Sequence, residues 1–169
     1  VYKRQGMILL LNVVTALVIG LLTEQLAVVA VFTLSFMVLR SYTGGYHSDS
    51  RIFCYLGSNL VLLVPVYTQA VFYKTSLAWL LAVLLVSAGI IFLLSPMHSK
   101  NRKLDKEEQK HFGRKARLIA ALELAVLGIL WHAGQIPYAY AVYTGICITA
   151  LFMIVGKAQL WIQSHTENG

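Results

Sequence analysis

Long apolar runs alternate with short polar gaps along almost the whole chain. Several runs approach the length of about 20 residues that an α-helix needs to cross the hydrocarbon core of a bilayer. The pattern predicts an all-α, polytopic membrane protein with six transmembrane helices in a single membrane domain over residues 1–169. The expected spans lie approximately at residues 7–23, 25–39, 52–73, 75–95, 118–135 and 137–156.

Polar residues between the runs indicate where helices end. Only Glu24 separates the first two runs, which predicts a tight hairpin. Ser95-Pro96 ends the fourth run, because the residue before a proline avoids the helical conformation. Asp105, with Glu108 three residues later, has the spacing of a helix cap, so a helix is expected to begin there and run into the fifth span. The longer gaps at 40–51 and 96–117 are expected to form two loops on one side of the membrane.

Composition supports membrane insertion. Hydrophobic residues make up 58% of the chain and charged residues 12%, whereas about a quarter of a soluble domain is charged. Two cysteines are too few for a disulfide framework. Cys147 lies within an apolar run and is expected to be a packing residue, while Cys54 lies at a span edge that water can reach.

The net charge of +7 is distributed in a way that favours a membrane rather than nucleic acid as partner. With six spans, all of the 14 basic residues except Lys74 fall on the side that holds both termini and both long loops. This asymmetry predicts that the termini and both loops are cytoplasmic.

The second cytoplasmic loop is strongly basic. One interpretation of its lysines and arginines is that they set the topology and contact anionic lipids. The other is that they form a docking surface for an acidic substrate, with Lys100, Arg102 and Lys103 as the candidates.

His47 and Cys54 are the candidates for chemistry, as general base and nucleophile facing the cytoplasm. Taken singly, such residues are more often a polar group at headgroup level and a packing residue. Seven residues on a continuous helix separate two side chains by about 10 Å of axial rise, which is too far for a hydrogen bond. If the two act together, the chain must bend between them.

The residues around the pair permit that bend. Gly44-Gly45 gives the backbone freedom before His47. Asp49 and Ser50 are good N-cap residues, so the third span should begin there and place Cys54 in its first turn. The helix dipole at that position favours a thiolate, and Arg51 adds a further positive charge.

Glu123 is an ionisable residue inside a predicted span, where such groups are costly and usually paired. The favoured interpretation is an ion pair with Arg40 or Arg51; the alternative is that Glu123 orients the imidazole of His47. Neither CxxC nor HxxxH spacing occurs, so we expect no metal and no other cofactor.

The stretch Arg40-Ser-Tyr-Thr-Gly-Gly-Tyr-His47, followed seven residues later by Cys54, resembles the signature of the accessory gene regulator protein B family, the membrane cysteine endopeptidases of bacterial quorum sensing. Ser95-Pro96 with the basic loop after it, and the opening Tyr-Lys-Arg-Gln-Gly before the first span, are similar too. The likeness covers nearly the whole chain. Because the chain opens without Met and the family carries a further amphipathic N-terminal segment, we expect the natural protein to begin upstream.

The resemblance implies a reaction and partners. Cys54 would be the nucleophile and His47 its general base and acid. The substrate would be a precursor peptide with an amphipathic helix, a core that contains Cys or Ser, and an acidic tail. Cleavage would leave a thioester that the core closes into a thiolactone or lactone autoinducer. The resemblance also implies a homodimer.

Two other function classes compete with this interpretation: a six-span transporter or channel, and a non-enzymatic membrane scaffold. The spans hold few polar residues and no internal repeat, which disfavours a transporter. Thiol labelling separates an enzyme from a scaffold, because a catalytic Cys54 should react at a pH well below that of an ordinary thiol.

Overall fold

The computed structural model describes the backbone of residues 2–43, 51–96 and 106–166, and the side chains of residues 10–43, 57, 59–96 and 110–162. Within these residues every regular element is an α-helix and there are six of them, as predicted. They are α1 (Tyr2–Leu22), α2 (Leu26–Thr43), α3 (Arg51–Lys74), α4 (Leu77–Leu94), α5 (Lys106–His132) and α6 (Ile136–Thr166).

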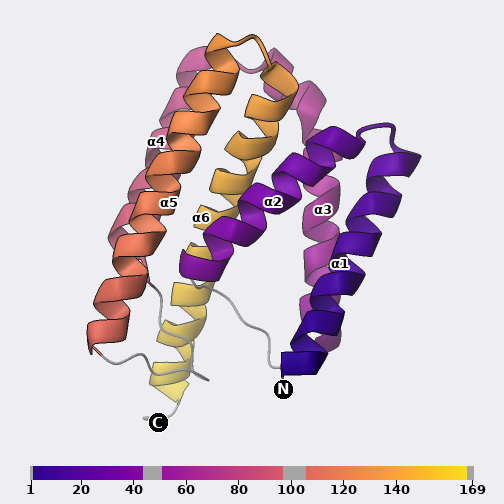
Figure 1. Cartoon of the computed structure of the whole chain (residues 1–169). Coiled ribbons are helices and arrows are strands. Elements are labelled where there is room, and N and C mark those ends of the chain that lie inside the picture. The colour runs from indigo at the N-terminus through magenta and orange to yellow at the C-terminus, as the bar shows by residue number, and fades with distance from the viewer. Residues whose placement is uncertain (1, 44–50, 97–105, 167–169) are drawn as a thin grey trace.

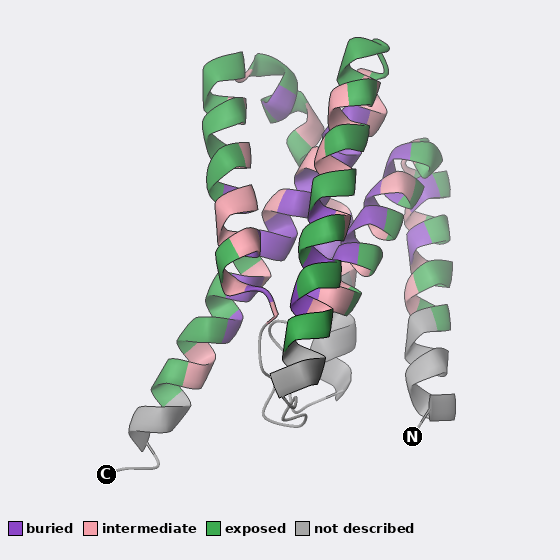
Figure 2. Cartoon of the chain, turned by 60° about the vertical axis from the view of Figure 1, so that its left-hand side comes forward, coloured by how far each residue is buried: buried purple, intermediate pink, exposed green. Residues whose placement is uncertain are grey.

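The helices run up and down, with three short turns at one end of the bundle and both terminal ends at the other (Figure 1). α6 is the central helix, since it packs against α2, α3, α4 and α5. α1 is attached through α2 and α3. Buried residues gather where the helices face one another, and the outward faces are exposed (Figure 2).

The exposed surface of the bundle is apolar, which is the reverse of a soluble protein. In α4, Ser87 and Ile91 face inward, whereas Leu85 and Leu93 are largely exposed. A helix that is apolar all round belongs in a membrane or a large core. Among the described residues three helices are long and apolar enough to cross a bilayer: Leu26–Thr43, Leu77–Leu94 and Ile136–Ile162.

Several helices extend beyond the apolar runs that predict them. α2 continues to Thr43, so the start of the expected loop at 40–51 is helical instead. α5 begins at Lys106, directly after the predicted cap at Asp105, so most of the expected loop at 96–117 is helix too. An apolar run predicts only the part of a helix that lies in hydrocarbon. The helix itself is longer, because its backbone hydrogen bonds continue into the polar residues that follow.

Two of the tight turns share one backbone arrangement. In both, the second residue after the helix has a positive φ, 57° at Glu24 and 73° at Gly134. The next amide donates back to the helix, from Gln25 to Gly20 O and from Gln135 to Leu130 O. These are Schellman turns, in which glycine is favoured because a side chain strains the left-handed conformation. Glu24 therefore carries strain that Gly134 avoids.

The two turns should respond oppositely to substitution. Glu24→Gly should raise the free energy of unfolding by about 0.5 kcal/mol, because relief of strain exceeds the added entropy of the unfolded chain. Gly134→Ala should lower it by a similar amount. Gly89→Ala, in the interior of α4 where a Cβ meets nothing within 4 Å, should raise it instead. Unfolding titrations in mixed micelles measure all three, and a stabilising Gly134→Ala contradicts the assignment of strain.

Candidate functional site

The catalytic candidates flank the connection between α2 and α3. Cys54 is the fourth residue of α3, so its backbone lies in the first turn, as the cap residues predict. Its side chain lies outside the described residues, and the hydrogen bond between His47 and Cys54 stays a prediction. The same holds for the other sequence candidates around them, namely Gly44, Gly45, Asp49, the side chain of Arg51, and Lys100, Arg102 and Lys103.

The helix that leads into this connection ends inside the bundle. α2 crosses α6 obliquely and stops against its middle, rather than at the end of the bundle (Figure 1). Its final residue, Thr43, is fully buried, as is Leu39 one turn earlier. The last residue of α2 is therefore buried.

Arg40 lies on the last turn of α2 and packs on aromatic rings. Its guanidinium carbon is 4.5 Å from the centre of the Phe152 ring on α6 and 5.6 Å from that of Phe36. The two rings are themselves 5.9 Å apart and tilted. A cation over an aromatic face is stabilised by the ring quadrupole, and a positive charge suits the C-terminal end of a helix. This contact fixes a positive charge at the start of the candidate motif.

Glu123 connects α5 to α2 through a hydrogen bond. Ser35 Oγ donates to Glu123 Oε2 at 2.8 Å. Gly145 on α6 makes this possible, because a Cβ there would lie only 2.6 Å from Ser35 Oγ. Ser35 thus occupies a point where α2, α5 and α6 meet.

The favoured ion pair between Glu123 and Arg40 is replaced by this hydrogen bond in the described structure. Arg40 lies five residues beyond Ser35, about 7.5 Å further along α2, where its guanidinium contacts Phe152 instead. A pair with Arg51, or an effect on His47, involves side chains outside the described residues. The hydrogen bond between Ser35 and Glu123 could have been suspected from the sequence, because small and hydroxyl residues such as Gly145 and Ser35 are common where membrane helices pack.

Tyr140 was not among the sequence candidates, yet it links α6 to α3 at the proline of that helix. Its hydroxyl donates to Pro65 O at 2.8 Å and lies 2.6 Å from Thr68 Oγ1. Because Tyr140 donates its single proton to Pro65 O, Thr68 is the donor in the contact between the two hydroxyls. The Thr68 hydroxyl can instead donate to Val64 O of its own helix. Proline removes one hydrogen bond from the ladder of α3, and the bond from Tyr140 to the carbonyl of Pro65 ties this weakened part of α3 to α6. The signal available in sequence was Pro65 itself.

A search of the described side chains for three or more His, Cys, Asp or Glu close enough to hold a metal ion finds none. The chemical groups that the structure does bring together are hydroxyls, one carboxylate and one guanidinium, all at helix junctions. They position α2 and α3, the two helices that carry the ends of the candidate motif.

These features define a helical membrane protein whose polar contacts converge on the two helices that flank a His–Cys motif. The chain belongs to the accessory gene regulator B family, whose profile matches residues 5–155. The match includes the motif and all the polar links above. Accessory gene regulator protein B of Staphylococcus intermedius is 25% identical over 155 residues, which cover 89% of this chain and 80% of that protein. No solved structure matches the chain significantly.

A double-mutant cycle should detect the link between Ser35 and Glu123. Ser35→Ala and Glu123→Ala should each lower the free energy of unfolding, with a coupling of about 1 kcal/mol, the usual scale for side-chain hydrogen bonds between helices in membranes. Ser41→Ala is the matched control, because Ser41 donates to Met37 O of its own helix. Additive effects of the two substitutions would show that the contact contributes nothing.

Proposed function

We propose that this chain is a membrane cysteine endopeptidase that cuts a quorum-sensing precursor peptide and lets its core close into a ring. The observation that carries the proposal is the family match over residues 5–155, which includes Arg40, the Gly44-Gly45 pair, His47 and Cys54 in the expected spacing. The start of α3 at Arg51 gives further support, since it puts Cys54 where a helix N-terminus favours a thiolate.

In the proposed reaction His47 accepts the thiol proton of Cys54, and the sulfur attacks the peptide bond between core and tail. The carbon–nitrogen bond then breaks, and the protonated His47 gives its proton to the departing amine of the tail. The core is left as a thioester on Cys54. Neutral His47 next accepts the proton of the core cysteine, whose sulfur attacks this thioester. The bond between the acyl carbon and Cys54 Sγ breaks as the thiolactone closes, and His47 returns the proton to the departing Cys54 thiolate. A core serine would give a lactone.

The order of these steps follows from energetics. Exchange of one thioester for another is nearly isoenergetic, so ring closure needs no external energy source. The second attack is intramolecular and has a high effective concentration. Water must be kept from the thioester, and a motif that starts at the buried end of α2 favours such a site. Arg40, held on Phe152, supplies a fixed positive charge at the start of the motif.

The basic segment before and within α5 is proposed to hold the acidic tail of the precursor. Lys110, Arg114 and Arg117 are exposed and lie three or four residues apart, so they share one face of α5. These three residues add to the sequence candidates Lys100, Arg102 and Lys103, which precede α5 in the chain. We also propose that all six helices cross a bacterial plasma membrane with both termini cytoplasmic, as the basic asymmetry indicates, and that the enzyme acts as a homodimer.

The direct test uses Cys54→Ala and a precursor peptide encoded beside this gene. Cys54→Ala should abolish cleavage, because no nucleophile remains, and His47→Ala should reduce it to near background while leaving a thiol that labels slowly. A precursor whose core cysteine is replaced by alanine should still be cut once by the unaltered enzyme. The thioester then has no internal attacker and should accumulate on Cys54, where intact mass spectrometry detects it and hydroxylamine removes it.

Cys147→Ala is the matched control, since it removes the chain's other thiol from the middle of α6 and should leave cleavage unchanged. Turnover of the precursor by Cys54→Ala would move the chemistry to another residue and leave the His–Cys pair with a structural role.

Charge removal in the basic loop should weaken binding in a salt-dependent way. Lys100→Gln, Arg102→Gln and Lys103→Gln together should raise KM at low ionic strength. Near 1 M salt the effect should be smaller, because the screening length between charges is only about 3 Å. The rate at which the Cys54 thiol is labelled should not change, because the loop acts on the tail and not on the nucleophile.

The comparison protein for this experiment carries Lys3→Gln, Arg4→Gln and Lys157→Gln, which remove the same charge from the same predicted side of the membrane. An equal rise in KM in both triple variants would mean that general surface charge, and not the loop, attracts the substrate.

A further inference from the structure

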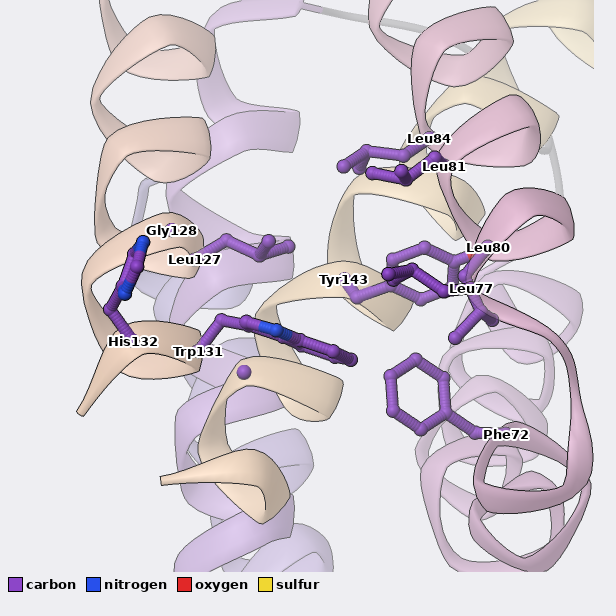
Figure 3. A pocket seen from close by; sticks show the side chains of 11 residues that line it. Phe72, Leu77, Leu80, Leu81, Leu84, Leu127, Gly128, Trp131, His132 and Tyr143 are labelled. Atoms are coloured by element: carbon purple, nitrogen blue, oxygen red, sulfur yellow. The ribbon is translucent and has the colours of Figure 1, made fainter. Parts of the chain in front are cut away.

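A cavity lies far from the candidate motif, at the end of the bundle where the short turns are (Figure 3). It has a volume of about 260 Å³ and lies between α4 and α5, with α3 and α6 behind it. It is separated from Cys54 by most of the length of α3, since Phe72, which lines it, is 18 residues further on, or about 27 Å of helix. The cavity therefore takes no direct part in the proposed cleavage.

The walls of the cavity are almost entirely apolar. Leu81 and Leu84 of α4 face Leu127 of α5 across it, and the flat indole of Trp131 lies along one side (Figure 3). The inner end is an aromatic cluster, in which the ring of Phe72 is 5.3 Å from that of Tyr143 and 6.4 Å from that of Trp131. Apolar cavities do not hold stable water, and one of about 150 Å³ accepts benzene. The apolar lining of the cavity therefore favours an apolar occupant.

The entrance indicates where the occupant comes from. Leu77 and Leu81, on the α4 side, are about half exposed, and the other exposed residues of α4, Trp79 among them, are apolar as well. α4 is among the helices long and apolar enough to cross a bilayer, so this face meets hydrocarbon and not water. A group that enters between α4 and α5 arrives sideways from the lipid.

We propose that this cavity is a binding site for one acyl chain of a membrane phospholipid, from the leaflet at the end of the bundle that carries the tight turns. The chain packs against the rings of Phe72, Tyr143 and Trp131 and completes the contact between α4 and α5. Because the lining is apolar apart from His132 and the hydroxyl of Tyr143, the site selects a hydrocarbon chain mainly by shape and dispersion.

The site can be tested with phosphatidylcholine whose acyl chains carry bromine, which quenches tryptophan on contact. In the variant Trp79→Phe with Trp161→Phe, Trp131 is the sole tryptophan. We expect strong quenching although Trp131 is only 37% exposed. Gly128→Leu should fill the cavity, because Gly128 lines it and a Cβ there meets nothing within 4 Å. Quenching should then fall by about half as chain contacts are lost.

Gly89→Leu is the matched control: it adds the same side chain to α4 at another glycine with open space around it, outside the cavity, and should leave quenching unchanged. Unchanged quenching after Gly128→Leu would overturn the proposal. So would a Trp131 that bromolipid does not quench in the parent protein, since the cavity is then closed or holds something else, such as a peptide.

Native mass spectrometry of the parent protein gives a result that does not depend on the folding of any variant. One phospholipid per chain should remain bound after detergent extraction. Ejection of every lipid at detergent concentrations that keep the protein folded would contradict a specific site. These outcomes are independent of Cys54, so they do not change with the success or failure of the proposed cleavage reaction.

Discussion

The close approach of α2 to α6 at Gly145 is the contact on which the arrangement of the other polar groups depends. A side chain larger than hydrogen at this position would collide with Ser35, which lies between α6 and α5. With the two helices this close, Ser35 on α2 forms its hydrogen bond to Glu123 on α5. The next residue, Phe36, packs against Phe152 on α6. Helices in lipid gain little from hydrophobic burial against one another, so packing of small residues and interhelical hydrogen bonds determine which faces meet.

α6 holds in place the two helices that flank the candidate motif, α2 and α3. α2 is held on it by Gly145 and by the contact of Arg40 with Phe152, and α3 is held by Tyr140 at Pro65. None of these contacts lies within the connection between α2 and α3. The frame around the proposed chemistry is thus built by a helix that contributes no candidate catalytic residue.

The sequence predicted the helices well and their contacts poorly. The ends of α3 and α4 were placed within two residues, and Asp105 correctly marked the start of α5, because local preferences and apolar length decide where helices begin and end. The partner of Glu123 was missed, as was the role of Tyr140. Both contacts depend on which faces of helices far apart in the sequence pack together. A serine or tyrosine in an apolar run does not indicate which helix it will face. The pairing of His47 with Cys54 remains a prediction from spacing and family likeness.

The oblique path of α2 has a consequence for the bilayer itself. Its 18 residues make about 27 Å of helix, less than the hydrocarbon thickness of about 30 Å even if it stood upright. α2 is tilted across α6 (Figure 1), so it spans still less. If α2 starts at one membrane surface, its last turn, which carries Arg40, ends short of the other. A charge at that depth draws headgroups and water toward it and thins the membrane locally. In that position the surface beside α2 would be a shallow aqueous depression, and a peptide lying flat on the membrane would reach the helix end without leaving the interface.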